Sequence, residues 1–254
     1  MMVIHTDYLL TVLLLALRVF AFVTMVPFFG TFFIPGFVRA YLSLGIALSI
    51  MSFAEIQPVE IRSVSAFIGI AFVELLFGFM AGLFLRFLFE AVFVAGEIIA
   101  VSTGLGLLTM FLPQQPQSTV LAGFSTMMAS VLFLSLGGAE AVYTGLVSSV
   151  RDVPIGSFSV YSLRGDVFLE LFYGSFSMGV VLALPVLIAT LLTNVIMAIV
   201  NRFIPQMNVF MVGLPLQLAV GLIVLTLSLP VLSITLVSYI REYVLSFVKF
   251  VSSG

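Results

Sequence analysis

The sequence predicts an all-α membrane protein. It has 254 residues, of which 62% are hydrophobic and 8% charged, whereas an ordinary soluble domain carries roughly 25% charged residues. The apolar runs are long and continuous, unlike the alternating segments of about 10 residues that build membrane barrels. Hydropathy predicts about six membrane spans, in one domain over residues 1–254 with a polar central loop near 151–166.

Composition also excludes several kinds of chemistry. The chain has no cysteine, and its one histidine, His5, lies near the N-terminus. The net charge is −2 and Lys249 is the single lysine, so no basic surface for nucleic acid is expected. Zinc-protease and phosphate-binding motifs are missing. We therefore expect no catalytic residues, no cofactor, no metal site and no bound nucleic acid, but extensive contact with membrane lipid.

The first two apolar runs predict a helical hairpin. Residues 8–26 are long enough for one membrane helix. Arg18 lies inside this run, and a cation at that depth should face protein or water; the alternative is that its side chain reaches out from near a helix end. A turn with Pro27 and Pro35 leads to a second run, from Arg39 to Phe53.

The run from Ser63 to Met110 is too long for one simple span. Gly78 and Gly82 are four residues apart, a spacing that lets helices approach closely. Three charged residues further on, Arg86, Glu90 and Glu97, fall on one stripe about 40° wide if the helix is continuous. A narrow charged stripe on an apolar helix favours burial at an interface or a wet lumen, although a membrane-surface segment would place the same charges in solvent.

The segment 103–120 interrupts this helix. Two glycines loosen it, two prolines stop helix formation, and its tip carries three glutamines around the prolines. Its first half is apolar and includes Met110, a side chain that adapts to irregular surfaces. Such a loop could close a conduit reversibly, or it could be a re-entrant or interfacial turn.

The C-terminal half continues the helical pattern. Its segments are an apolar run over 121–136, an amphipathic piece ending at Arg151-Asp152, a polar loop over 153–165, and long apolar runs over 167–200 and 210–248. Pro185 is expected to break the first of the long runs, and Pro215 and Pro230 the second, because proline removes a backbone donor and clashes with the preceding turn.

The most informative stretch runs from residue 201 to residue 217, here called the signature segment. It is polar and rich in helix-breaking residues, yet it lies between two apolar runs. In an apolar setting the backbone groups freed by Pro205 and Pro215 need partners, which the side-chain amides of Gln206, Asn208 and Gln217 could supply. The stretch could also be a plain turn between two membrane helices.

The signature segment resembles one family. The pattern Asn201-Arg202-x-x-Pro205-Gln206-x-x-Val209-Phe210-x-x-Gly213-x-Pro215 resembles that of the FliR family, the export-gate proteins of flagellar biosynthesis and type III secretion. Gly96-Glu97, Pro154-Ile-Gly156 and Ala183-Leu-Pro185-Val follow the family's order of motifs. The resemblance covers essentially the whole chain.

This resemblance implies kinked helical hairpins packed in a hetero-oligomeric export-gate assembly with FliP-like and FliQ-like subunits. The assembly would admit unfolded flagellar substrates and work with an FlhB-like switch protein and an FlhA-like export motor. It would lie in the bacterial inner membrane as part of the flagellar basal body. The implied pore plug comprises Gly106, Leu107, Leu108, Thr109, Met110, Phe111, Leu112, Pro113, Gln114, Gln115, Pro116, Gln117 and Ser118.

Two alternatives remain open on the sequence. One is a virulence-type (injectisome) export-gate subunit. The other is a stand-alone ion-coupled transporter that uses intramembrane carboxylates at Glu74, Glu90 and Glu97. A transporter should complete its site within one chain, whereas these charges are isolated along the sequence and favour partners in other subunits.

Overall fold

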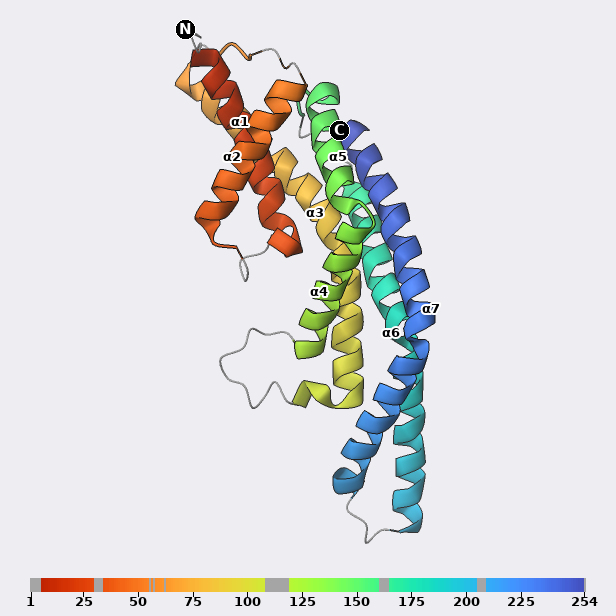
Figure 1. The fold of residues 1–254 in the computed structure, drawn as a ribbon. Coiled ribbons are helices and arrows are strands. Elements are labelled where there is room, and N and C mark those ends of the chain that lie inside the picture. Colours follow the sequence, from red (N-terminus) through yellow and green to blue (C-terminus); the bar gives the residue numbers. More distant parts are fainter. Residues whose placement is uncertain are drawn as a thin grey trace. The chain divides into compact units, whose positions relative to one another are not determined.

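The computed structural model shows an all-helical chain, as predicted (Figure 1). It describes residues 6–29, 34–54, 56, 58–61, 63–107, 119–159, 165–204 and 209–253, and over these residues it has no strand. The elements are α1 (Thr6–Met25), a short 3₁₀ turn η1 (Pro27–Phe29), α2 (Gly36–Phe53), α3 (Val64–Thr103), α4 (Val120–Ser135), α5 (Gly138–Asp152), α6 (Gly165–Phe203) and α7 (Val209–Ser253).

The prolines of α6 and α7 do not end these helices, so the expected breaks are wrong. Pro185 lies inside α6, which has 39 residues, and Pro215 and Pro230 lie inside α7, which has 45. Each proline removes a single backbone donor, and a long helix in an apolar setting keeps all its other hydrogen bonds because no alternative partners are available there. Pro205 is outside the described residues.

The helices form two compact units. Unit 1 comprises Met1–Phe87, Phe133–Leu171 and Arg241–Gly254, and unit 2 comprises Leu88–Leu132 and Phe172–Ile240. Helices α3, α4, α6 and α7 each contribute residues to both units. The assignment of residues 1–254 to one domain stays a prediction.

Unit 1 is held by close helix contact and an aromatic core. A Cβ at Gly78 would lie 2.0 Å from the Arg18 carbonyl oxygen, and one at Gly82 would lie 2.7 Å from Met25 Cβ. The predicted role of these glycines, close approach of helices, is thus confirmed for α3 against α1. At the core, the ring of Phe84 lies 5.9 Å from that of Phe247.

Unit 2 depends on glycine contacts as well. A Cβ at Gly179 of α6 would lie 2.8 Å from the Ala91 carbonyl oxygen of α3. A Cβ at Gly221 of α7 would lie 2.3 Å from Thr103 Cγ2, also on α3. Between these contacts, Ile99, Ala183 and Val186 form a buried apolar cluster. Helix α3 is therefore the element against which the others in this unit pack.

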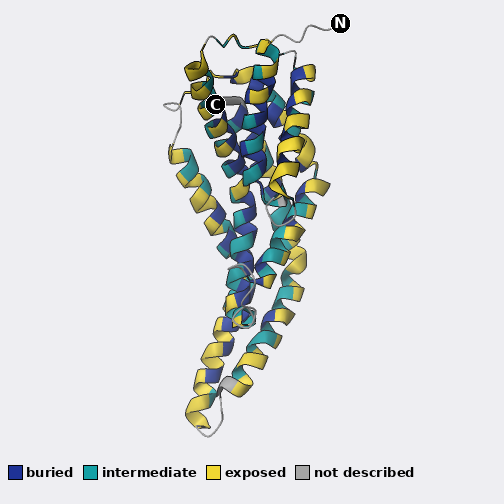
Figure 2. Cartoon of the chain, turned by 90° about the vertical axis from the view of Figure 1, so that its left-hand side faces the viewer, coloured by how far each residue is buried: buried dark blue, intermediate teal, exposed yellow. Residues whose placement is uncertain are grey.

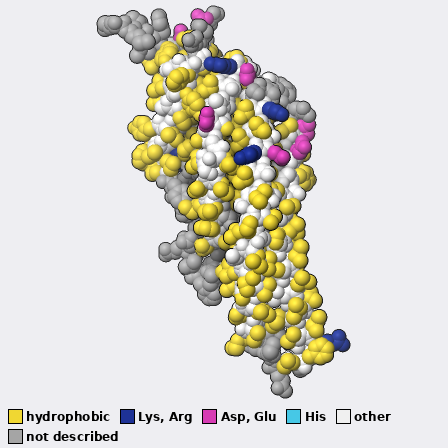
Figure 3. Space-filling view, turned by 45° about the vertical axis from the view of Figure 1, so that its right-hand side comes forward, with side chains coloured by type: hydrophobic (Ala, Val, Ile, Leu, Met, Phe, Trp, Pro, Cys, Tyr) yellow, Lys and Arg dark blue, Asp and Glu magenta, His cyan; other side chains and the backbone are white. Residues whose placement is uncertain are grey.

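The surface identifies a membrane protein. Among the described residues, five helices are long and apolar enough to cross a membrane, and a sixth span results if the pair α4 and α5, bent by 70°, is counted as one. In Figure 2 exposed residues recur along the helices beside buried ones, and Figure 3 shows that the exposed face is mostly hydrophobic with few charges. Tyr41 and Leu227 are 73% and 75% exposed, as side chains in contact with lipid or partner subunits would be.

Candidate functional site

Two residues singled out in the sequence, Glu97 of the charged stripe and Gln217 of the signature segment, lie at the two ends of the loop 104–118. The contacts at these two ends are made by five residues of unit 2, here called the loop anchor: Gly96, Glu97, Ser102, Thr119 and Gln217. Of the predicted plug, Gly106 and Leu107 are described. Residues 108–118 lie outside the described residues, so the plug itself stays a prediction.

The first end of the loop begins where α3 stops. Gly104 has φ +82°, a left-handed conformation that favours glycine over residues with a side chain. Its N–H donates to the Val101 carbonyl at 3.2 Å, and the Leu107 N–H donates to the Gly104 carbonyl at 3.1 Å. The helix thus ends at Thr103 with a glycine cap, seven residues before the end of the apolar run at Met110.

Gln217 holds this first end. Its side-chain amide Nε2 donates to the Ser102 carbonyl, one of the last four carbonyls of α3, which have no partner within the helix. The carbonyl that Gln217 binds is therefore freed by the end of α3, and not by Pro205 or Pro215 as expected from the sequence. Gln206 and Asn208 are outside the described residues.

The second end of the loop is fixed by Glu97. The Thr119 N–H donates to Glu97 Oε1 at 2.7 Å. Thr119 also caps α4, because its Oγ1 accepts the Ala122 N–H at 3.2 Å and its carbonyl accepts the Gly123 N–H at 3.1 Å. A Cβ at Gly96 would lie 2.6 Å from Ala122 Cα. Only glycine at this position lets the start of α4 lie so close to Glu97.

The charged stripe is continuous but is not buried within this chain. Arg86, Glu90 and Glu97 all lie on α3, which is one unbroken helix, so the condition for a single stripe is met. Arg86 is exposed, and Glu90 and Glu97 are half-buried. The expected burial of the stripe, at an interface or a wet lumen of an assembly, stays a prediction.

The signature segment lies mostly in helix. Asn201 and Arg202 are exposed in the last turn of α6, while Gly213 and Pro215 belong to α7. The connection between the two helices covers only residues 204–208, so the expected break is much shorter than the segment. Pro205 and Gln206 are outside the described residues, as is the side chain of Phe210.

A second polar cluster lies in unit 1. Arg18 and Glu74 are fully buried, with Nε 2.5 Å from Oε2 and Nη2 3.1 Å from Oε1. Arg18 also donates to the carbonyls of Ser149 and Val153 at 3.2 Å, and the Gly156 N–H donates to Glu74 Oε1 at 2.9 Å. The buried contact expected for Arg18 is confirmed.

The partner of Arg18 was not predicted. The only signal in the sequence was that Arg18 and Glu74 are opposite charges within two separate apolar runs. The cluster connects α1, α3 and the end of α5, and the Arg18 guanidinium lies 4.5 Å from the centre of the Phe77 ring. Its charges satisfy each other and the backbone, so it has the features of a structural connection rather than of a binding site.

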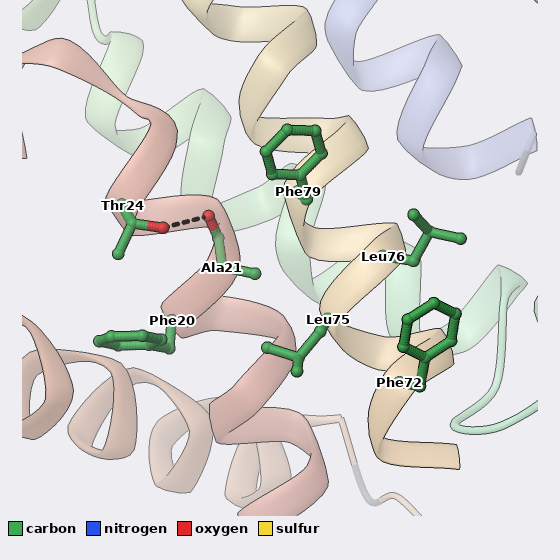
Figure 4. Close-up of a pocket in the computed structure, with 7 residues that line it drawn as sticks. All are labelled: Phe20, Ala21, Thr24, Phe72, Leu75, Leu76 and Phe79. Atoms are coloured by element: carbon green, nitrogen blue, oxygen red, sulfur yellow. Dashed lines mark hydrogen bonds between the residues drawn. The ribbon is translucent and has the colours of Figure 1, made fainter. Parts of the chain in front are cut away.

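An apolar groove of about 340 Å³ lies between α1 and α3 in unit 1 (Figure 4). It is lined by Phe20, Ala21, Thr24, Phe72, Leu75, Leu76 and Phe79. Its one polar side chain, Thr24, donates to the Ala21 carbonyl at 2.8 Å. The groove therefore offers no group for acid–base or nucleophilic chemistry. Among the described residues, no three acidic, histidine or cysteine side chains are grouped to hold a metal ion.

Comparison with known proteins identifies the family. Residues 9–243 match the family described as "Bacterial export proteins, family 1". The chain is 46% identical to the flagellar biosynthetic protein FliR of Aquifex aeolicus, over 97% of this chain and 96% of the relative. It is 31% identical to FliR of Escherichia coli, over 85% and 83% of the two chains, and 28% identical to FliR of Bacillus subtilis, over 87% and 86%. The chain therefore belongs to the FliR family of bacterial export proteins.

Proposed function

We propose that this chain is a subunit of the flagellar type III protein-export gate. In this proposal it assembles with FliP-like and FliQ-like subunits in the bacterial inner membrane, within the flagellar basal body. The assembly forms the entry channel for unfolded flagellar substrates and works with an FlhB-like switch protein and an FlhA-like export motor. The chain itself contributes structure and closure rather than catalysis.

The observation that carries this proposal is the end-to-end match to proteins named for flagellar biosynthesis, 46% identical over 97% of the chain. The relatives compared above are flagellar proteins by name, which favours a flagellar over an injectisome member.

The structure supports assembly with partners in a second way. In α7, only 6% of the most apolar membrane-spanning window is buried within this chain. Leu227 and Ile234 are 75% and 69% exposed on this helix. Either lipid or apolar partner subunits must cover such a surface, and a hetero-oligomeric gate would supply such subunits.

The transporter alternative is less well supported. Glu74 is neutralised by Arg18 in a buried pair, and Glu97 accepts a backbone N–H. Both carboxylates are thus engaged in holding helices together. A transporter would need ionisable groups placed around a substrate site, at a cavity or at interrupted helices, and the groove in unit 1 is lined by seven residues with no ionisable side chain.

The assembly is tested by native mass spectrometry after mild detergent extraction. The tagged chain is co-expressed with its genomic neighbours, and the expected product is one large hetero-oligomer with other small hydrophobic subunits. Recovery of the chain alone or as a homodimer would contradict the proposal, and ion transport by Glu74, Glu90 and Glu97 variants would then be measured.

The role of the predicted plug is tested separately. Deletion of residues 107–118 should leave the assembly intact but make reconstituted vesicles leak small ions. The deletion begins after Gly104, so it keeps the cap of α3 and both contacts of the loop anchor. An intact deletion complex that stays tight to ions would show that this loop is not the seal.

A further inference from the structure

The first turn of α2 has two backbone donors without acceptors in the helix. The N–H groups of Val38 and Arg39 donate to the Pro35 carbonyl at 3.0 and 3.3 Å. The N–H groups of Gly36 and Phe37 come before them and have no acceptor within the helix. Pro35 stands at the cap position, and its side chain has no acceptor with which to cap them. The beginning of α2 is therefore an open helix N-terminus, which attracts anions.

Arg39 places an unpaired cation at the same end. Its side chain is 9% exposed, and its Nε is buried with no hydrogen-bond partner among the described residues. A Cβ at Gly36 would lie 3.8 Å from Arg39 Nη2. The guanidinium is thus folded back onto the first residue of the helix, in the direction in which helical side chains lean. Gly36 itself is exposed, so a ligand can reach this end from outside the chain.

A buried guanidinium needs an anion, because burial of an uncompensated charge is strongly unfavourable. Arg18 of the same unit shows the usual arrangement, since it is paired with Glu74 and donates to two backbone carbonyls. Among the described residues, no carboxylate occupies the corresponding place beside Arg39. The guanidinium and the free N–H groups together fit the oxygens of a phosphate.

The position of this end favours a phospholipid as the source of the phosphate. Helix α2 is apolar enough to cross a membrane and has 18 residues, or about 27 Å, close to the hydrocarbon core of about 30 Å. The first turn of such a span lies at the level of the lipid headgroups. Phe37 and Tyr41, one turn apart on one face of α2, are 66% and 73% exposed. An acyl chain would cover this apolar surface, and inorganic phosphate would not.

We propose that the N-terminus of α2 binds the phosphate group of an anionic phospholipid. Arg39 supplies the charge, and the N–H groups of Gly36 and Phe37 supply further donors. An acyl chain lies against Phe37 and Tyr41. A zwitterionic lipid binds less well, because its cationic headgroup comes close to Arg39. All these residues belong to unit 1, so the site is independent of the proposed export gate.

The test measures lipid binding by the full-length chain in mild detergent. Phosphatidylglycerol is added, native mass spectrometry measures the fraction of chains that retain it, and phosphatidylcholine is the zwitterionic reference. Arg39→Gln removes the cation, and Arg151→Gln is the matched control at an exposed position in the last turn of α5. We expect the dissociation constant for phosphatidylglycerol to rise about tenfold or more in Arg39→Gln and to stay unchanged in Arg151→Gln.

A second pair of variants tests the backbone donor at Gly36 and covers the case in which Arg39→Gln does not fold. Gly36→Pro removes the N–H, and proline fits at the first position of a helix. Pro35 already has the extended conformation that a following proline requires, with φ −57° and ψ 149°. Gly36→Ala keeps the N–H and adds a Cβ at ordinary contact distance. We expect phosphatidylglycerol binding to weaken about tenfold in Gly36→Pro and to change little in Gly36→Ala.

Several results would overturn the inference. One is equal binding of phosphatidylglycerol by Arg39→Gln and the parent, and another is equal binding of phosphatidylglycerol and phosphatidylcholine by the parent. A rise in the unfolding temperature with inorganic phosphate that equals the rise with phosphatidylglycerol would assign the site to free phosphate. If the parent retains no phosphatidylglycerol and Arg39→Gln fails to enter the co-expressed complex, a carboxylate of a partner subunit occupies the site and the lipid is wrong.

Discussion

The buried pair of Arg18 and Glu74 gives the sharpest prediction about folding. Both side chains are fully buried, and Glu74 accepts three hydrogen bonds, two from Arg18 and one from the Gly156 N–H. Removal of one partner leaves an uncompensated buried charge, which typically costs about 3–5 kcal/mol. Glu74→Leu also leaves the Gly156 N–H without its acceptor, and Arg18→Met leaves the Val153 carbonyl without its donors.

The double variant Arg18→Met/Glu74→Leu should be at least as stable as either single variant. It contains no stranded charge and leaves two backbone groups, the Val153 carbonyl and the Gly156 N–H, at about 1–3 kcal/mol each. The Ser149 carbonyl is not stranded, because it also accepts the Val153 N–H at 2.9 Å. The double variant should therefore lose about 2–6 kcal/mol, against about 4–8 for each single variant.

The assay is unfolding of the purified protein in mild detergent by added denaturing detergent, followed by far-ultraviolet circular dichroism. Arg151→Met is the control, since it removes an exposed arginine from the last turn of α5 and should change the free energy of unfolding by less than about 1 kcal/mol. If the losses of the two single variants simply add in the double variant, the two charges are not coupled and the reasoning is refuted.

Two further predictions concern packing and the loop anchor. Gly78→Ala should destabilise the protein by about 1–3 kcal/mol or more, because its Cβ would lie 2.0 Å from the Arg18 carbonyl oxygen. Gly69→Ala is the control, because a Cβ there would have no atom within 4 Å, and it should stabilise the protein by about 0.5–1 kcal/mol. Thermal unfolding of both variants tests this, and a change in stability of the same sign in both would contradict it. Gln217→Met should lose about 1 kcal/mol and accelerate hydrogen exchange at residues 102–107, because the Ser102 carbonyl loses its donor, while Leu216→Met, at a 39% exposed position, should leave that exchange unchanged.

The spacing of apolar residues and the positions of glycine and proline predicted the helices but not the effect of internal prolines. The glycine pair at 137 and 138 marks the bend between α4 and α5, and Gly137 indeed has φ +82°. Pro185 and Pro230 produce the same local signal as a terminator, yet both lie within helices. A helix in water can replace a lost internal hydrogen bond by hydrogen bonds to solvent, and a helix in lipid cannot. The rule that proline ends a helix therefore applies poorly to the apolar runs that form α6 and α7.

The site could be predicted only as separate parts. Gly96-Glu97, the loop and the signature segment each stood out in the sequence, but their contacts depend on which helices pack on α3. Glu97 shows the reason: at the level of sequence it belonged to a charged stripe, which was expected to lie at an interface or a wet lumen. The structure gives it a backbone N–H, 22 residues further along the chain. No local sequence pattern predicts which backbone N–H a carboxylate binds when that N–H belongs to a distant segment.

The loop anchor also explains why polar residues persist in such an apolar chain. A loop that interrupts a membrane-embedded helix leaves carbonyls at the end of one helix and an N–H at the start of the next. Water would satisfy them at an exposed surface, but away from water each unpaired group costs about 1–3 kcal/mol. Gln217 serves the carbonyl of Ser102 and Glu97 serves the N–H of Thr119. The polar side chains are therefore placed where the backbone is interrupted, so loss of either should loosen the loop before it unfolds the helices.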